Sequence, residues 1–309
     1  MTILDVIRRS TEFLAGRGVD SPRLQVELLL AHVLKLPRLK LYLQFDRELT
    51  EAELNPLRDL VKRRGQREPL QHLTGTAAFL AHEIKVTREV LVPRPETEML
   101  AQLAVQKLSA AGGQPMASEA DRMPAARCLD FGTGSGCLAI AIAAACPETE
   151  VHAIDKSPAA LTIARENAAS NGVAGRIAFL EGDGFAALAA HPSSGIRLPP
   201  FDLVVTNPPY IPTAEIATLD PEVRDHDPRL ALDGGADGLD FYRRLATEAV
   251  PWLVPGGWLL AEFGDGQAEA VSGIFTGAGW SSEGVEKDLS GRERVLIVRS
   301  PQAAGEAMA

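Results

Sequence analysis

Cysteine is scarce in this sequence, with three among 309 residues. Cys128, Cys137 and Cys146 are too few and too widely spaced for a disulfide framework or a zinc site. Each lies among apolar residues, where cysteine behaves as a small hydrophobic side chain. The six histidines form no HExxH motif or similar cluster. We therefore expect no bound metal.

Long apolar runs are also missing. The longest, CLAIAIAAAC from residue 137, is far shorter than the roughly 20 residues that a membrane-spanning helix needs. The start of the chain, MTILDVIRRS, has an acidic residue inside its apolar stretch, unlike a signal peptide. We expect a cytoplasmic protein with no membrane contact.

Basic residues are outnumbered, 31 against 41 acidic ones, for a net charge of −10. Free duplex DNA is therefore not the expected partner. Residues 1–80 carry 13 basic and 10 acidic residues, or +3, which leaves −13 for the remainder. The basic excess lies in RDLVKRRGQRE, either as a solvated helix face or as a docking surface for an RNA-rich or acidic partner.

The first seventy-odd residues carry helical patterns. Ser21 is a candidate helix-capping residue, and Pro22 after it would take the first helical position. Thr50 and Glu53 form a capping box ahead of an apolar stripe. We expect a helical domain at 1–73, a β-hairpin linker at 74–95, a larger domain at 96–300 with a Gly/Ala-rich loop at 111–126, and a flexible tail at 301–309.

From residue 127 onward, strand patterns alternate with helix patterns, and the chain ends in a strand pair. This alternation predicts an α/β fold with a Rossmann-like sheet, whose parallel strands have helices on both faces and ligands at their carboxyl ends. The expected strands are RCLDFG, EVHAID, RIAFLEGD, FDLVVTN and GWLLAEF, and the expected helices include SPAALTIARENAAS and GLDFYRRLATEAVPWL.

Three successive strand ends predict a nucleoside site. The first ends in the glycine-rich turn Gly132-Thr133-Gly134-Ser135-Gly136, whose backbone can approach a ligand closely. Asp155 ends the next strand, where a carboxylate can accept hydrogen bonds from ribose hydroxyls. Asp183 ends the third strand, where it or its neighbours can contact an adenine. The GxGxxG dinucleotide pattern is incomplete, because Cys137 takes the third glycine position.

The fourth strand ends in Asn207-Pro208-Pro209-Tyr210. The nitrogen of an amide or aromatic amine is a poor nucleophile, because its lone pair is delocalised. The Asn207 side-chain oxygen and the Pro208 carbonyl can accept both N–H bonds of such an –NH₂ group and stabilise the charge that develops on it. Tyr210 offers a flat face to a planar group. These residues predict methylation of a planar –NH₂ without metal or covalent intermediate.

These motifs give the chain a resemblance to the release factor glutamine methyltransferase family (PrmC/HemK), class I methyltransferases that use S-adenosylmethionine. It covers nearly the whole chain through REPLQHLTGTAAFLAHEIKV, VLVPRPETE, LDFGTGSGCLAIAIA, AIDKSPAAL, TNPPYIP, LALDGGADGLDFYRR and GGWLLAEFG. It implies methylation of the glutamine side-chain nitrogen in the GGQ motif of bacterial peptide chain release factors.

The resemblance also implies roles for residues. The turn 132–136, Asp155, Asp183 and Gly184 would hold the donor together with Asn207, although a bulkier residue can occupy the position of Gly184 in the family. The catalytic and substrate residues would be Asn207, Pro208, Pro209 and Tyr210, with Phe79 packed near the donor or substrate, and Arg94 and Glu96 at the entrance or in a helix start. The helical domain would dock the factor, with Arg63 and Arg64 as candidate contacts, and we expect a monomer.

Three alternatives remain open: a ribosomal protein L3 glutamine methyltransferase, an adenine-N6 DNA methyltransferase, and a nucleoside-binding module without catalysis. VPRPETE and YLQFDREL favour the release factor enzyme over the first. The charge of −13 outside residues 1–80 disfavours the second, which would need a basic groove for a flipped base. An intact Asn207 and Tyr210 disfavour the third. The internal Gly112-Gly113-Gln114 is interpreted as a chance match to the substrate motif.

Overall fold

A computed structural model of the chain describes residues 1–111, 126–189 and 200–302. The described residues form two compact units. The first consists of residues 1–76, 86–88 and 218–227, and the second contains the other described residues. Residues 112–125 of the predicted loop at 111–126, which include Gly112-Gly113-Gln114, and most of the predicted tail fall outside the described residues.

The first unit is helical. Its apolar core includes Ile3, Leu14, Leu29 and Leu57, each at most 2% exposed. The predicted capping box of Thr50 is present, with both reciprocal hydrogen bonds formed. The helices are α1 (Ile3–Ala15), α2 (Pro22–Leu34), α3 (Arg38–Tyr42), α4 (Glu51–Gly65), α5 (Leu70–Thr74) and, from the later segment, α10 (Pro221–Arg224).

The prediction for the start of α2 is half right. Pro22 is its first residue, as expected, but the side chain of Ser21 caps nothing. Ser21 has a left-handed backbone, φ 48° and ψ 49°, whereas a capping residue needs an extended one to aim its hydroxyl at the first turn. The following proline does not account for this backbone, because proline favours the extended region for the residue before it.

The basic cluster of α4 is largely paired inside the first unit. Arg64, with a side chain only 4% exposed, donates to Glu222 of α10 at 2.7 Å. Arg67 donates to the same carboxylate at 2.6 Å, and Arg63 donates to Glu68 at 2.7 and 2.8 Å. Arg64 is therefore a buried structural residue, and its expected role as a docking contact was wrong.

The second unit is built on a seven-stranded sheet in the order β5-β4-β3-β6-β7-β9-β8. The strands from β5 to β7 are parallel, and β9 and β8 add an antiparallel edge pair, as the sequence predicted. The α/β fold and the separate hairpin of β1 and β2 are thus confirmed. The strands are β1 (Thr76–Phe79), β2 (His82–Lys85), β3 (Arg127–Phe131), β4 (Glu150–Asp155), β5 (Ile177–Glu181), β6 (Phe201–Thr206), β7 (Leu253–Glu262), β8 (Ser281–Lys287) and β9 (Glu293–Arg299).

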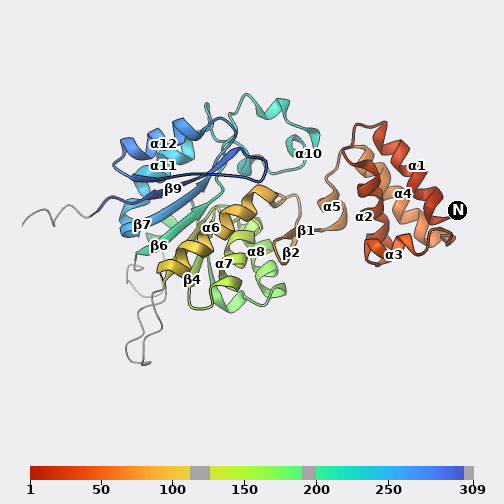
Figure 1. Cartoon of the computed structure of the whole chain (residues 1–309), viewed down its shortest axis with the longest axis horizontal. Helices are drawn as coiled ribbons and strands as arrows, with labels where there is room; N and C mark the ends of the chain where they lie inside the picture. The colour runs from red at the N-terminus through yellow and green to blue at the C-terminus, as the bar shows by residue number, and fades with distance from the viewer. Residues whose placement is uncertain (112–125, 190–199, 303–309) are drawn as a thin grey trace, which may run out of the picture. The chain divides into compact units, whose positions relative to one another are not determined.

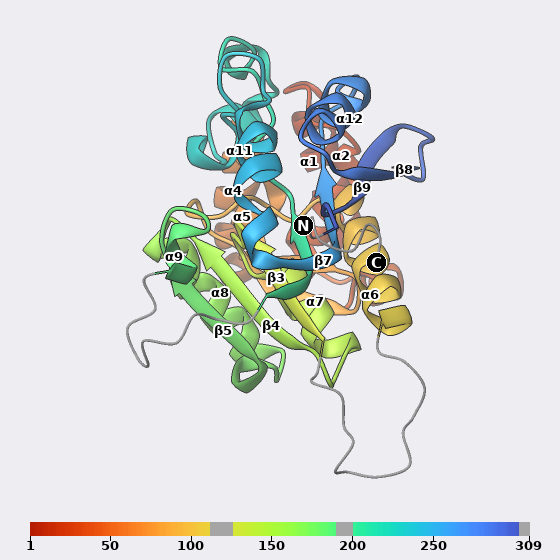
Figure 2. The same cartoon turned by 90° about the vertical axis from the view of Figure 1, so that its left-hand side faces the viewer.

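Helices cover both faces of this sheet, with α6, α7 and α8 on one side and α11 and α12 on the other (Figures 1 and 2). Ser157 caps α8 as predicted, accepting from the N–H of Ala160 at 3.1 Å. The helices are α6 (Pro95–Ala111), α7 (Cys137–Ala145), α8 (Pro158–Ser170), α9 (Ala186–Ala189), α11 (Asp240–Glu248) and α12 (Ala268–Gly277), with 3₁₀ turns at Ala174–Arg176, Ile216–Thr218, Arg229–Ala231 and Val250–Trp252. Helix α11 ends earlier than expected, because Pro251 cannot continue a helix interior.

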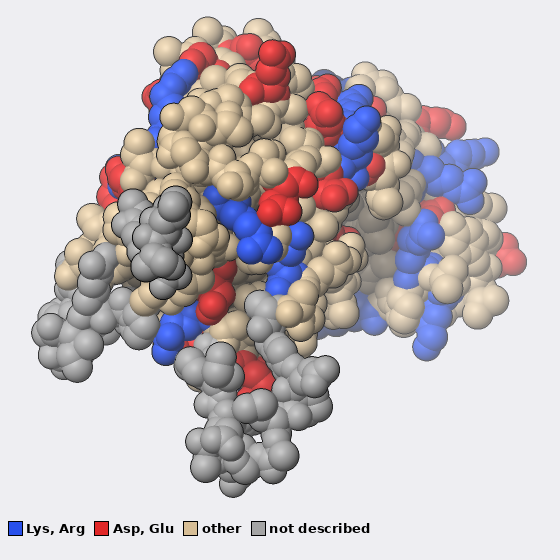
Figure 3. Space-filling model, turned by 60° about the vertical axis from the view of Figure 1, so that its left-hand side comes forward, with Lys and Arg blue, Asp and Glu red and all other residues tan. Residues whose placement is uncertain are grey.

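Charged side chains of both signs are interspersed on the face shown in Figure 3, where no large area is basic alone. Across the described ranges, no helix combines the length and apolar character needed to cross a bilayer. No group of three His, Cys, Asp or Glu side chains within residues 1–111, 126–189 and 200–302 could hold a metal ion.

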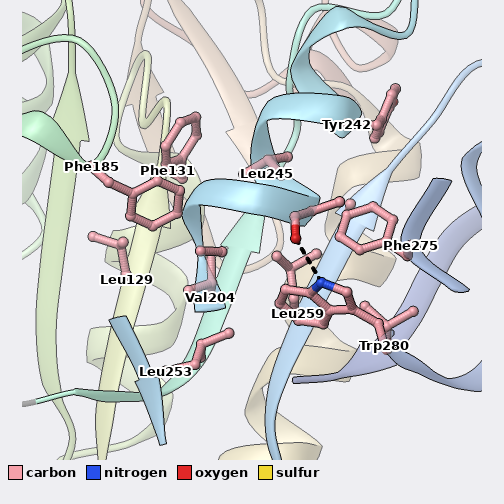
Figure 4. Close-up of a cluster of buried hydrophobic side chains, with 14 of the residues drawn as sticks. Leu129, Phe131, Phe185, Val204, Tyr242, Leu245, Leu253, Leu259, Phe275 and Trp280 are labelled. Carbon is pink, nitrogen blue, oxygen red and sulfur yellow. Dashed lines mark hydrogen bonds between the residues drawn. The ribbon is translucent and has the colours of Figure 1, made fainter. Parts of the chain in front are cut away.

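The core of the second unit anchors α11 against the sheet. Tyr242 and Leu245 of α11 point into a cluster with Phe275 and Trp280, and all four side chains are at most 3% exposed (Figure 4). The Trp280 indole N–H donates to the Ala246 carbonyl at 2.9 Å. The helix is thereby fixed, and its neighbouring face is presented to the carboxyl ends of the strands.

Candidate functional site

A cavity of about 480 Å³ lies at the carboxyl ends of the parallel strands in the second unit. The strand order reverses between β3 and β6, where open α/β sheets bind their ligands. The volume lies within the roughly 300–1,000 Å³ of small-molecule sites. Its lining includes Val90, Leu91, Pro93, Arg94, Thr97, Gly132, Thr133, Gly134, Ser135, Asp155, Lys156, Asp183, Gly184, Asn207, Pro208, Pro209, Phe241 and Arg244.

The glycine turn after β3 exposes backbone to the cavity at Gly132 and Gly134, where no side chain intervenes. Gly132 and Gly134 have φ of 75° and 54°, in the left-handed region that favours glycine. A Cβ atom at either residue would have nothing within 4 Å, so the space beside both is open. The N–H groups of Gly132 and Thr133 both donate to the Ile154 carbonyl at 2.9 Å, which ties this turn to β4.

Asp155 joins the glycine turn to the start of α8. Its Oδ2 accepts from the N–H of Gly134 and its Oδ1 accepts from the N–H of Ser157, both at 2.8 Å. The carboxylate is half-buried and lines the cavity. Each carboxylate oxygen has more than one lone pair, so both can still accept from ligand hydroxyls.

Asp130, the second-last residue of β3, holds the same glycine turn through its side chain. Its fully buried carboxylate accepts from the Thr133 hydroxyl at 2.6 Å and from the N–H of Ala139 at 3.1 Å. Burial raises the pKa of Asp130 to about 7. The sequence contained this residue inside the LDFGTGSG motif, but its pattern gave no sign that the side chain turns back under the loop.

Gly136 does not line the cavity, although we grouped it with the donor-binding residues. Its φ is 83°, and a Cβ there would lie 3.1 Å from Cβ of Ala164 on α8. The structure therefore gives this glycine a packing role, as the residue that lets α7 begin close to α8.

Asp183 lies at the end of the cavity beyond Asp155, but its carboxylate is already engaged. Arg244 of α11 donates to Oδ1 and, at 2.9 Å, to the Asp183 carbonyl, while Lys156 lies 3.2 Å from Oδ2. The hydrogen bond from Arg244, followed by that from Lys156, lowers the pKa of Asp183. Sequence reasoning missed Arg244, which stands 61 residues further along the chain.

Asn207 is held by a hydrogen-bond relay that the sequence did not reveal. Its Nδ2 donates to the Thr97 hydroxyl at 3.0 Å, and that hydroxyl donates to Oε2 of Glu262 at 2.8 Å. An ionised Glu262 can only accept, so the single proton of Thr97 is then used on Glu262 and Thr97 accepts from Asn207. The relay therefore fixes the amide with Nδ2 toward Thr97 and leaves Oδ1 as its free acceptor.

Glu262 ends β7 in a buried position, 1% exposed. Burial raises its pKa to about 7, against the opposing effect of the Thr97 hydrogen bond. Glu262 belongs to the GGWLLAEFG motif, from which sequence reasoning predicts no role for it. An acidic residue closing an otherwise apolar strand was the available signal.

Pro208 and Pro209 line the cavity with Asn207, whereas Tyr210 does not. The Tyr210 ring packs against the core beside Gly264, and burial raises its pKa to about 12, so it is neutral near pH 7. Its carbonyl accepts from Nε2 of Gln267 at 2.9 Å. Tyr210 thus anchors the turn in this structure, and its predicted stacking against a substrate stays a prediction.

Phe79, Arg94 and Glu96 differ in their positions. The Phe79 side chain is 0% exposed and outside the cavity lining, so the geometry gives its expected ligand contact no support. Arg94 lines the cavity, and Glu96 does not. Both precede Thr97 around the start of α6, which begins at Pro95 as the sequence predicted.

The residues present fit an adenosine-containing methyl donor. The Cβ-free floor at Gly132 and Gly134 accepts a chain packed against backbone, Asp155 offers acceptors for a ribose, and the far end near Asp183 has room for a base. Asn207 directly follows β6, which lies on the other side of β3 in the sheet. The cavity therefore brings a nucleoside site and an amide acceptor together.

Two family models match the chain. One described as "PrmC N-terminal domain" matches residues 5–75, and one described as "Methyltransferase small domain" matches residues 110–219. Among solved structures, the hMettl16 catalytic domain has a TM-score of 0.50 at 13% identity, over 82% of this chain and 84% of that chain. That likeness concerns the fold alone.

Curated relatives extend over almost the full length. The release factor glutamine methyltransferase of Deinococcus radiodurans is 44% identical over 306 residues, which are 99% of this chain and 100% of the relative. That of Geobacter sulfurreducens is 42% identical over 296 residues, covering 96% and 95% of the two chains. That of Rhodospirillum rubrum is 41% identical over 93% of this chain and 82% of the relative.

Proposed function

Because the chain belongs to the release factor glutamine methyltransferase family, we propose that it methylates the side-chain amide nitrogen of a glutamine in peptide chain release factors. The glutamine would be that of the GGQ motif, and S-adenosylmethionine would be the donor. The observation that carries this proposal is the fixed orientation of Asn207 on the donor cavity.

The reacting amide needs acceptors for its two N–H bonds. Oδ1 of Asn207 and the carbonyl of Pro208 are both acceptors without a donor function, and Pro208 has a fixed φ that limits how its carbonyl can move. Two such acceptors orient the –NH₂ plane and stabilise the positive charge that develops on nitrogen. The donor, when bound, would supply an activated methyl group on its sulfonium sulfur and leave as the neutral thioether. The amide nitrogen would lose one of its two protons to solvent, and the chain's own residues would position that nitrogen.

Thr97 and Glu262 act as positioning residues in this scheme, because they touch Asn207 or its partner. A free asparagine side chain can present either its oxygen or its nitrogen to the cavity. Presenting Nδ2 would set one donor against another and would repel the substrate amide. The relay excludes this orientation through the hydroxyl of Thr97.

We expect Thr97→Val to lower the methyl-transfer rate by roughly 10–10²-fold, since a small misplacement of a reacting group has an effect of that size. Affinity for S-adenosylhomocysteine should be unchanged, because Asp155 and the glycine turn are untouched. Thr97→Ser restores the hydroxyl and should restore the rate. A Thr97→Val enzyme as fast as the wild type would remove the relay from the mechanism.

The proposed activity is tested by transfer of labelled methyl groups to three purified acceptors offered separately: an intact release factor, ribosomal protein L3 and duplex DNA. We expect label in the release factor alone, located by mass spectrometry at the GGQ glutamine. A release factor with that glutamine replaced by glutamate is the matched control. Label in L3 or DNA, with an unlabelled release factor, would favour the corresponding alternative.

We propose that the helical unit docks the release factor. Arg63 stays exposed enough to contribute, with a side chain 41% exposed, although it is shared with Glu68. A short GGQ peptide offered in the same assay should be methylated more slowly than the intact factor. We expect the enzyme to act as a cytoplasmic monomer.

A further inference from the structure

The guanidinium of Arg244 forms part of the cavity wall next to Asp183. All of its nitrogens are engaged at the edge of the guanidinium plane. Nε donates to the Glu248 carboxylate at 2.9 and 3.0 Å, Nη1 donates to Oδ1 of Asp183, and Nη2 donates to the Asp183 carbonyl at 2.9 Å. The side chain is 28% exposed. Three of its five N–H groups are thus donated to protein acceptors, and its flat face makes none of these hydrogen bonds.

Gly184 makes room for this arrangement. Its φ is 66°, and a Cβ atom there would lie 2.5 Å from Nη2 of Arg244 and 3.2 Å from Cζ of Phe131. A side chain at this position would need the volume that the guanidinium now fills. The glycine and the arginine are thus complementary, and Arg244 forms part of the cavity wall at this point.

The position of Arg244 in the cavity corresponds to the base of the donor. The sheet order β5-β4-β3 puts the glycine turn, Asp155 and Asp183 on successive strands. If Asp155 binds the ribose, the base extends past it toward the end of β5, where Arg244 stands. Helix α11 is fixed by Tyr242, Leu245 and the Trp280 hydrogen bond, so the guanidinium is held on a rigid element (Figure 4).

We propose that Arg244 is the platform on which the adenine ring of the donor stacks, and that Asp183 and Glu248 hold this platform flat. The inference rests on the proposed function, because it takes the ligand to be an adenosine-containing donor. Guanidinium planes stack on nucleobases, since the group is planar, delocalised and weakly hydrated. Asp183 would then act through Arg244, as a positioning residue.

A different use of Arg244 would be an ion pair with the carboxylate of the donor's amino-acid end. The geometry disfavours it, because the carboxylates of Asp183 and Glu248 already neutralise the guanidinium, and three of its five N–H groups are donated to these two residues. The two uses are separable with a ligand that keeps the amino-acid end and lacks the base.

Titration calorimetry should compare S-adenosylhomocysteine with S-ribosylhomocysteine, which has the ribose and amino-acid end but no adenine. We expect Arg244→Ala and Arg244→Lys each to weaken binding of S-adenosylhomocysteine by roughly 2- to 30-fold. Lysine keeps the charge but has no flat face. Binding of S-ribosylhomocysteine, measured by competition if weak, should be unchanged in both variants, which also shows that the site is folded.

Arg243→Ala is the matched control. Arg243 is the next residue of the same helix, pairs with Asp237 and Asp240, and does not line the cavity, so both affinities should stay at the wild-type values. Equal weakening of both ligands by Arg244→Ala, or full affinity in Arg244→Lys, would overturn the platform alone. Failure of the wild-type protein to bind S-adenosylhomocysteine would overturn the proposed function and this inference with it.

Discussion

Replacing Asn207 with alanine should lower methyl transfer to the release factor by at least about 10²–10³-fold, the usual effect of removing one preorganised group that stabilises developing charge. The variant loses Oδ1, one of the two acceptors proposed for the reacting –NH₂. It also leaves the Thr97 hydroxyl with no incoming donor, while the hydrogen bond from Thr97 to Glu262 can persist. Transfer would be followed with labelled donor at saturating release factor.

Donor binding should survive this change, because the glycine turn and Asp155 hold the nucleoside part without Asn207. Calorimetry with S-adenosylhomocysteine measures that affinity on the same preparation. Asn171→Ala provides the control, since the Asn171 amide lies outside the cavity lining and donates to the carbonyls of Glu83 and Asn167. Turnover of Asn207→Ala near the wild-type rate would remove Asn207 from the reaction.

The second large effect concerns Asp155. Asp155→Ala should weaken binding of S-adenosylhomocysteine by about 1–3 kcal/mol, roughly 5- to 150-fold, the range expected for lost hydrogen bonds to a charged group. The loss has two sources in the structure. The carboxylate accepts from the N–H groups of Gly134 and Ser157, and it is the proposed acceptor for the ribose hydroxyls.

Asp155→Asn separates these sources in part, because its amide oxygen can replace one acceptor, and a smaller loss is expected. Asp202→Asn is the matched control, since Asp202 also accepts a backbone N–H, that of Arg127 at 2.8 Å, near the other end of its strand. Circular dichroism would verify that each variant is folded. An unchanged affinity in Asp155→Ala would take Asp155 out of the site.

Features that depend on neighbours in sequence were predicted well. The capping box at Thr50, the cap at Ser157 and the start of α6 at Pro95 each follow from a few consecutive residues. The alternation of strands and helices gave the sheet, and the strand ends gave the positions of Asp155 and Asn207. The prediction that Ser21 caps α2 was wrong, because Ser21 has a left-handed backbone and its side chain makes no capping hydrogen bond.

Features that depend on distant pairs could not be predicted in this way. Thr97 and Asn207 are 110 residues apart, and Thr97 and Glu262 are 165 apart. Thr97 is not unusual in its local sequence. Glu262 does stand out as an acidic residue at the end of an apolar strand, but only the fold brings it together with Thr97 and Asn207. The same holds for the pairing of Arg64 with Glu222, 158 residues away, which turned an expected surface arginine into a buried one.

The segment 218–227 is part of the first unit, although the chain on both sides of it belongs to the second. Cutting the chain after residue 76 would therefore leave the second unit whole in the longer fragment, residues 77–309, and would divide the first unit between the two fragments. The longer fragment would keep Glu222, buried enough to need its arginines, while losing both Arg64 and Arg67. The unpaired carboxylate of Glu222 would lie in the segment that follows Asn207. A catalytic defect in this fragment could therefore come from misfolding near Asn207 as well as from the loss of a docking surface.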